Sequence, residues 1–111
     1  NASNRYGWSS YLGIEPGSIE ITSLAAPARL DDVGGLPPAW IGVGTLDLFH
    51  DEDVAYATRL RAGGVPCELS VVDGVFHGFD GVSPGSPVAR RYRESLMDAM
   101  AGVMAGVIAL Q

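Results

Sequence analysis

The chain has 111 residues, 47% apolar and 18% charged, a length and composition typical of one globular domain and not of a disordered or fibrous segment. Seven basic residues against thirteen acidic give a net charge of −6, which argues against nucleic acid as a partner. The single cysteine, Cys67, cannot form an internal disulfide, and we expect a buried thiol in a strand. No apolar run approaches the ~18 residues that a membrane helix needs, so no membrane span is expected.

Residues 1–35 are predicted to be rich in loops. Trp8, Tyr11 and Leu12, spaced by three and four positions, indicate one short helical turn there. The segments "EPGS", "APARLDD" and "GGLPP" contain the residues that favour turns. The next segment, "PAWIGVG" (38–44), is typical of a short strand buried on both faces of a parallel sheet.

A helix is expected over "DEDVAYATRLRAGG", with Asp51 at its N-cap or in its first turn and Gly63-Gly64 ending it. Its inward face is predicted to comprise Val54, Tyr56, Ala57 and Leu60. The segment "CELSVV" (67–72) then predicts a second strand. Strand, helix and strand within about 35 residues indicate a right-handed parallel βαβ unit.

Ser86-Pro87 predicts the start of a long final helix, with serine as N-cap and proline at the first helical position. Apolar residues that recur at spacings of three or four positions predict a core-facing stripe: Val88, Tyr92, Leu96, Met100, Val103 and Val107. Arg90, Arg91 and Arg93 at the start of this helix are expected to form a solvated face.

Two parallel strands do not make a stable sheet, and a parallel pair needs cover on both faces. We therefore expect residues 1–111 to be the C-terminal portion of a single larger α/β domain, whose first strand presents an edge to a missing strand. Pairing of two copies through that edge or through the final helix, giving a homodimer, is a further expectation.

Two side chains follow the carboxyl ends of the predicted strands, where open parallel sheets bind their ligands. Asp47 follows the first strand and His77 follows the second. A carboxylate that orients a histidine, which in turn accepts a proton from a serine hydroxyl, forms two thirds of a nucleophilic triad. The strand order predicts that the two loops meet.

Each of these assignments has a rival. Asp47 could be a turn carboxylate, and Asp51, Glu52 and Asp53 compete for the acid role, although they are more typical of first-turn residues that complement the helix dipole. Asp51 is the nearest competitor because it could orient the loop by accepting backbone hydrogen bonds. His77 could be a structural or an exposed loop histidine. His50 is expected to face solvent, and the two histidines show no metal-ligand spacing with the carboxylates.

The pattern Gly-x-Ser-x-Gly occurs once, as "GVSPG" at 81–85, and we reject Ser83 as a nucleophile. The oxyanion hole in this type of site uses the backbone N–H of the residue after the serine, and Pro84 has none. The chain order would also be acid, base, serine, instead of the serine, acid, base order in which the pattern is used. The nucleophile is expected to lie outside this chain.

The stretch "GLPPAWIGVGTLDLFHDEDVAYATRLRAGGVPCELSVVDGVFHGFD" resembles the C-terminal part of the hormone-sensitive-lipase-like family of α/β-hydrolases, and the likeness extends over nearly the whole chain. It is carried by "LDLFHDED" and "FHGF", although Leu48 stands where the family usually has proline. The resemblance implies that Asp47 is the acid and His77 the base of a Ser-Asp-His triad. It also implies an upstream serine elbow and oxyanion loop.

The resemblance further implies a serine carboxylesterase or lipase that acts on short- to medium-chain esters and requires no cofactor. The fragment alone is expected to be inactive. A non-catalytic ligand receptor on the same fold is the alternative. Trp8, Phe76 and Phe79 are candidates for the substrate pocket, and a cytoplasmic location is expected, with any export signal upstream of residue 1.

Overall fold

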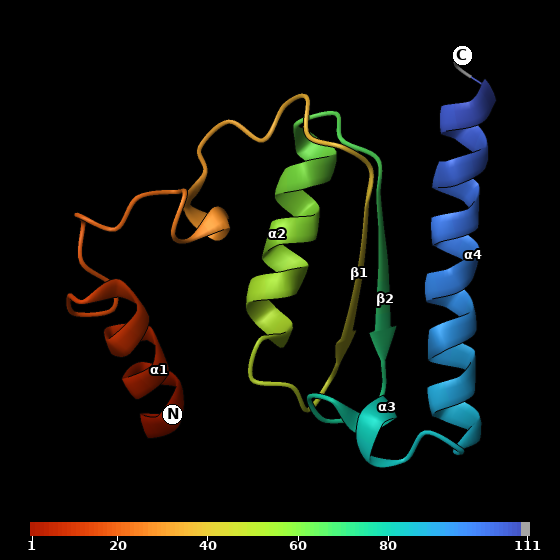
Figure 1. Ribbon diagram of the computed structural model, residues 1–111, viewed down its shortest axis with the longest axis horizontal. Helices are drawn as coiled ribbons and strands as arrows, with labels where there is room; N and C mark the ends of the chain where they lie inside the picture. Colours follow the sequence, from red (N-terminus) through yellow and green to blue (C-terminus); the bar gives the residue numbers. More distant parts are fainter. Residues whose placement is uncertain (110–111) are drawn as a thin grey trace. The chain divides into compact units, whose positions relative to one another are not determined.

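The computed structural model describes residues 1–109 and divides the chain into two units, Asn1–Asp32 and a second unit that begins at Val33. The first unit contains helix α1 (Ala2–Leu12) and a 3₁₀ turn, η1 (Pro27–Arg29). The second contains β1 (Ala39–Gly44), α2 (His50–Ala62), β2 (Cys67–Val72), α3 (Phe79–Val82) and α4 (Pro87–Ala109) (Figure 1). The α/β fold class expected from the sequence is confirmed.

Helix α1 is longer than the single turn that the sequence predicted. The Asn1 side chain accepts a hydrogen bond from the Asn4 N–H (2.9 Å), which satisfies one of the free donors of the first turn. The helix ends at Gly13, whose φ of 69° is left-handed and whose N–H donates to the Ser9 carbonyl (2.9 Å). Polar capping at both ends therefore defines a helix that apolar spacing alone did not reveal.

The strands β1 and β2 pair in parallel, as expected, and they form a two-stranded sheet within the described residues. Ala39 lies opposite Cys67 and Gly44 opposite Val72, so both strands end at the same edge. Helices α2 and α4 lie on opposite sides of this sheet (Figure 1). Each strand also has an edge unpaired within residues 1–109, so pairing with another strand stays a prediction.

The core of the second unit lies mainly between the sheet and α2. Val43, Ala57 and Leu60 are almost fully buried, and Val65 closes the turn after the helix. The expected inward face of α2 is correct in part, because Val54 and Tyr56 are half-buried. Asp51 lies in the first turn together with Glu52 and Asp53, where the helix dipole favours negative charge.

Three burial predictions were wrong. Cys67 is half-buried, because it is the first residue of β2 and lies at the end of the sheet. Only Val43 and Gly44 of β1 are buried, since the sheet has too few neighbours to cover the rest of the strand. The apolar stripe on α4, which was expected to face the core, is only half-buried from Val88 to Leu96.

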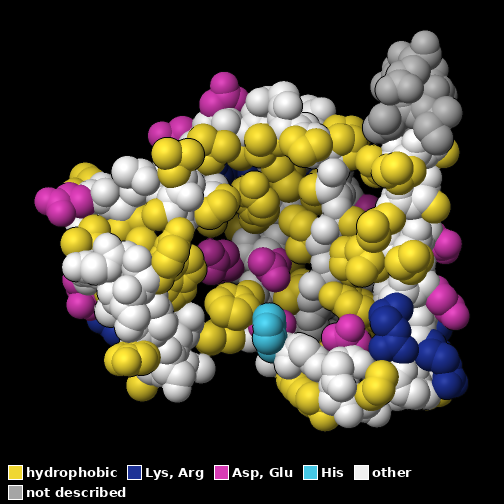
Figure 2. Space-filling model, viewed as in Figure 1, with side chains coloured by type: hydrophobic (Ala, Val, Ile, Leu, Met, Phe, Trp, Pro, Cys, Tyr) yellow, Lys and Arg dark blue, Asp and Glu magenta, His cyan; other side chains and the backbone are white. Residues whose placement is uncertain are grey.

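Further along α4 the stripe is exposed. Met100 and Val103 are 53% and 41% exposed, and Val107 lies outside the residues whose side chains are described. Figure 2 shows apolar side chains gathered along this helix. The helix is thus longer than the two strands can cover.

The start of α4 is capped as the sequence predicted. The Ser86 Oγ accepts a hydrogen bond from the Ala89 N–H at 3.2 Å. Two of the arginines expected on a solvated face also donate hydrogen bonds to backbone carbonyls. Arg90 donates to the Gly85 carbonyl (2.6 Å) and Arg93 to the Asp80 carbonyl (3.3 Å), so both hold the connection from α3 to α4.

Within residues 1–109, none of the helices has the length and hydropathy that crossing a membrane requires.

Candidate active site

The Asp47 side chain projects from the turn between β1 and α2 and is only 7% exposed. Its Oδ1 accepts the Phe49 N–H at 2.9 Å, an Asx-type turn in which a short carboxylate satisfies a backbone donor two residues ahead. The second oxygen, Oδ2, lies 2.9 Å from Nδ1 of His77. Both oxygens of this nearly buried carboxylate are therefore engaged.

The His77 side chain comes from the loop after β2 and is 72% exposed. An ionised carboxylate only accepts hydrogen bonds, so the nitrogen that faces Asp47 carries the proton. The other ring nitrogen, Nε2, is then unprotonated in the neutral imidazole. The Phe49 ring contacts the imidazole edge to face, with centroids 5.4 Å apart. The pair therefore consists of a nearly buried acid, fixed by hydrogen bonds, and a base that is accessible to solvent.

Backbone hydrogen bonds join the two loops that carry this pair. The Thr45 N–H donates to the Val72 carbonyl (3.0 Å) and the Leu46 N–H donates to the Val75 carbonyl (3.1 Å). Gly44 allows this approach, because a Cβ at that position would lie 2.1 Å from the Val75 oxygen. At the far end of the loop, Gly78 has a φ of 72° and starts α3.

The pair opens into a cavity of about 230 Å³. Phe76 and Phe79, both predicted as pocket residues, line it from the loop and α3. Phe76 is 50% exposed and available to a ligand, whereas Phe79 is 7% exposed and packs edge to face on Tyr92 (5.1 Å). Trp8 lies on α1 in the other unit, where it contacts Tyr11 (6.0 Å), and its part in a pocket stays a prediction.

Tyr92 and Asp53 also lie close to the pair. Tyr92 lines the same cavity from α4, and its hydroxyl donates to the Gly42 carbonyl at 3.2 Å. Burial raises the pKa of this phenol, and the charges of Asp80, Asp47 and Asp53 add to the effect. The spacing of the α4 stripe placed Tyr92 toward the sheet but held no signal that it reaches the end of β1.

Asp53, a rival for the acid role that was expected to complement the dipole of α2 instead, also interacts with the pair. Burial raises its pKa, followed by repulsion from Asp47 and Glu52, while His77 and His50 act in the opposite direction. Asp53 thus interacts electrostatically with both members of the pair. Its place in the first turn after Asp47 could have suggested this proximity.

The nearest rival of Asp47, the second histidine and the rejected serine lie elsewhere. Asp51 is fully exposed and pairs with His50, whose Nδ1 lies 2.8 Å from Oδ1 of Asp51. His50 is 30% exposed, so it is less open to solvent than expected. Ser83 caps the end of α3, with its N–H donating to the Phe79 carbonyl (2.9 Å), and it does not line the cavity beside His77.

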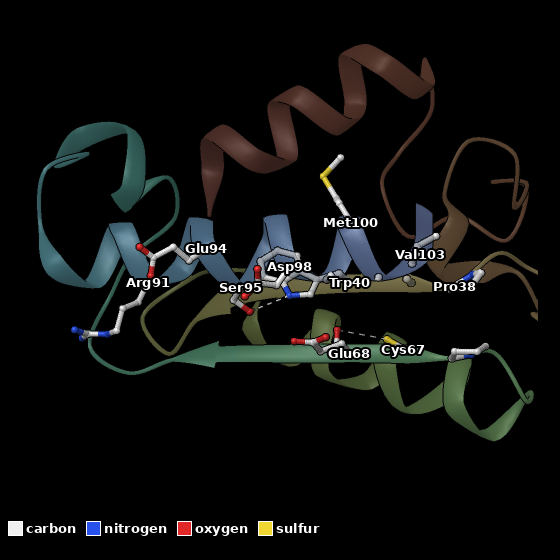
Figure 3. A pocket seen from close by; sticks show the side chains of 14 residues that line it. Pro38, Trp40, Cys67, Glu68, Arg91, Glu94, Ser95, Asp98, Met100 and Val103 are labelled. Carbon is white, nitrogen blue, oxygen red and sulfur yellow. Dashed lines mark hydrogen bonds between the residues drawn. The ribbon is translucent and has the colours of Figure 1, made fainter. Parts of the chain in front are cut away.

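A cavity of about 920 Å³ lies elsewhere, at the amino ends of the strands and along α4 (Figure 3). There the Trp40 Nε1 donates to the Ser95 Oγ at 3.4 Å. Parallel sheets bind ligands at the carboxyl ends of their strands, so we place the candidate active site at the smaller cavity beside His77. Within the described residues, no cluster of three His, Cys, Asp or Glu side chains could hold a metal ion.

Comparison with known proteins identifies the family. Residues 1–81, a segment that includes both Asp47 and His77, match the family described as alpha/beta hydrolase fold. Arylacetamide deacetylase of Oryctolagus cuniculus is 32% identical over 98 residues, covering 84% of this chain and 24% of that protein. Esterase LipI of Mycobacterium tuberculosis is 36% identical over 64 residues, covering 58% of this chain and 20% of that protein.

Among solved structures, the esterase LipW of Mycobacterium marinum superimposes with a TM-score of 0.72 at 32% identity, covering 84% of this chain and 30% of that one. The chain thus spans about a fifth to a quarter of the length of the curated relatives described above. It belongs to the α/β-hydrolase fold family of carboxylesterases and lipases.

Proposed function

We propose that this chain supplies the acid and the base of a serine carboxylesterase. The observation that carries the proposal is the 2.9 Å contact between the nearly buried Asp47 carboxylate and Nδ1 of the exposed His77. Relatives named esterase, carboxylesterase and deacetylase support ester hydrolysis as the reaction class.

In this proposal Asp47 accepts the Nδ1–H and fixes the tautomer, which leaves Nε2 to take the proton of a serine hydroxyl. The serine oxygen attacks the ester carbonyl and forms an acyl-enzyme. The imidazolium of His77 gives its proton to the alcohol, which leaves as the acyl-enzyme forms. His77 then removes a proton from the attacking water and returns it to the serine oxygen as the acyl–serine bond breaks and the carboxylic acid leaves. The carboxylate of Asp47 stabilises the imidazolium in both steps.

The serine and the oxyanion donors are proposed to come from chain outside residues 1–111. Ser83 does not suit the role, because it ends α3 and is followed by Pro84, which has no N–H to stabilise an oxyanion. We therefore propose that the 111-residue chain alone is inactive and that the intact protein hydrolyses short- to medium-chain esters. Phe76 lines the cavity and is 50% exposed, so it is the lining aromatic side chain that is free to contact an acyl chain.

The test compares the intact protein with the isolated chain in p-nitrophenyl acetate hydrolysis. We expect turnover only from the intact protein. His77→Ala should lower kcat by ~10⁴-fold or more, because triad members act as a unit, whereas Ser83→Ala should leave it unchanged. Activity of the isolated chain that depends on His77 would overturn the proposal.

Labelling with diisopropyl fluorophosphate locates the nucleophile independently. Mass spectrometry of the labelled intact protein should place the adduct outside residues 1–111. An adduct on Ser83 would contradict the assignment.

A further inference from the structure

We propose that Thr45 is a positioning residue, whose hydroxyl holds the loop of His77 against the loop of Asp47. This inference rests on the proposed function, because the position of His77 affects turnover only if His77 acts as the base.

The Thr45 hydroxyl makes two hydrogen bonds across the two loops. Thr45 directly follows β1 and precedes Asp47 by two positions. Its Oγ1 donates to Oδ1 of Asp73 (3.1 Å) and accepts the Gly74 N–H (2.8 Å). Asp73 and Gly74 begin the loop that leads to His77, so a single hydroxyl joins the first residue of one loop to the first two residues of the other.

The acid–base contact itself is poorly suited to hold the loops together. The His77 side chain is 72% exposed, and a hydrogen bond with one partner open to water contributes little to stability. The contact therefore depends on how the surrounding backbone places its two members. The backbone bonds from Thr45 to Val72 and from Leu46 to Val75 set the separation of the strand ends.

The Thr45 hydroxyl acts between those two backbone bonds, where the loop reverses. Gly74 has a φ of 71°, a left-handed conformation that favours glycine and turns the chain after β2, and its N–H donates to the Thr45 side chain instead of to a strand. Thr45 gives this N–H an acceptor and gives the Asp73 carboxylate a donor. The direction in which the chain leaves Gly74 sets where Phe76 and His77 lie, two and three residues further along.

The residue type allows a clean test. Thr45→Val keeps the shape and removes both hydrogen bonds, and Thr45→Ser keeps the hydroxyl. Thr58 on α2 is a matched control, because its hydroxyl donates to the Val54 carbonyl (2.9 Å) away from the site. Asp73→Ala removes only the donated bond and serves as a second variant should Thr45→Val fail to fold.

The experiment measures kcat and KM for p-nitrophenyl acetate in the intact protein, at a temperature where circular dichroism shows each variant folded. Small misplacements of catalytic groups lower turnover steeply. We expect Thr45→Val to lower kcat about 10-fold with KM changed less than about twofold, and Thr45→Ser to restore most of the loss. Asp73→Ala should lower kcat several-fold, and Thr58→Val should match the unaltered protein.

The outcomes separate this inference from the proposed function. An inactive His77→Ala beside a fully active Thr45→Val, or beside a fully active Asp73→Ala if Thr45→Val does not fold, overturns the role of Thr45 alone. A loss in Thr45→Val that serine does not restore also overturns it, because the effect would then come from packing. An active His77→Ala overturns the proposed function and this inference with it.

Discussion

Substitution of Gly44 by alanine tests whether the close approach of the two loops determines both stability and activity. Gly44 is the last residue of β1 and is buried. An alanine Cβ would lie 2.1 Å from the Val75 oxygen and 2.8 Å from its carbonyl carbon. These atoms belong to backbone, so a side-chain rotation cannot relieve the clash.

The cost follows from this geometry. The Val75 carbonyl would have to retreat from 2.1 Å to at least 3.0 Å, the distance below which real Cβ contacts are essentially not found. Overpacking of this kind costs about 1–3 kcal/mol, and weakening the bond from the Leu46 N–H to the same oxygen costs about 1 kcal/mol more. We therefore expect the free energy of unfolding to fall by roughly 2–4 kcal/mol. Because Val75 precedes His77 by two positions, kcat for ester hydrolysis should fall by up to about 100-fold.

Urea denaturation of the intact protein, followed by circular dichroism, measures the first effect, and p-nitrophenyl acetate turnover measures the second. A lower urea midpoint with an unchanged dependence of the unfolding free energy on urea concentration indicates lower stability. The surface exposed on unfolding is then the same in both proteins. Gly102→Ala is the control, since that exposed glycine on α4 has open space around it and should gain about 0.5–1 kcal/mol from helix propensity. If Gly44→Ala keeps its stability within about 0.5 kcal/mol and its full activity, the close approach is unimportant and the reasoning fails.

Two further predictions concern charge and capping. Asp53 has a raised pKa in the folded chain, so its charged form is disfavoured there and it lowers stability once the pH exceeds its ordinary value of 3.8. Asp53→Asn should therefore raise the urea midpoint at pH 7, and this gain should shrink as the pH falls toward 3.8; a gain that is constant with pH would contradict the assignment. Ser86→Ala removes the acceptor of the Ala89 N–H and should lower the free energy of unfolding by about 1 kcal/mol in the same assay, with Ser86→Asp, another good N-cap residue, retaining most of it. An equal loss in both variants would show that capping is not the cause.

Much of the second unit was predictable because its signals are local. The strand at 39–44 follows from a short apolar run, the strand at 67–72 from the segment "CELSVV", and the start of α4 from Ser86-Pro87. The order strand, helix, strand predicted a parallel pair, which places the residues after both strands at one edge. The meeting of Asp47 and His77, 30 positions apart, follows from that topology.

Burial was predicted less well, because it depends on neighbours that no local pattern specifies. The apolar spacing of α4 continues past Leu96, yet Met100 and Val103 are exposed where the two strands no longer cover them. Helix α1 was underestimated for the opposite reason, since polar caps and not apolar spacing define its ends. The positions of Asp53 and Tyr92 beside the pair depend on how α2 and α4 pack on the sheet.

The sequence by itself determined the residue types, the order of the elements and the edge of the sheet at which the acid and the base come together. Only the tertiary structure decided which carboxylate reaches His77, how deeply it is buried and which groups hold the two loops together. The physical reason is the separation along the sequence of the residues that interact. Strand and helix formation depend on neighbours a few positions apart, whereas the bonds of Asp47 with His77 and of Thr45 with Asp73 and Gly74 join loops about 30 positions apart and form only when packing brings the strand ends together.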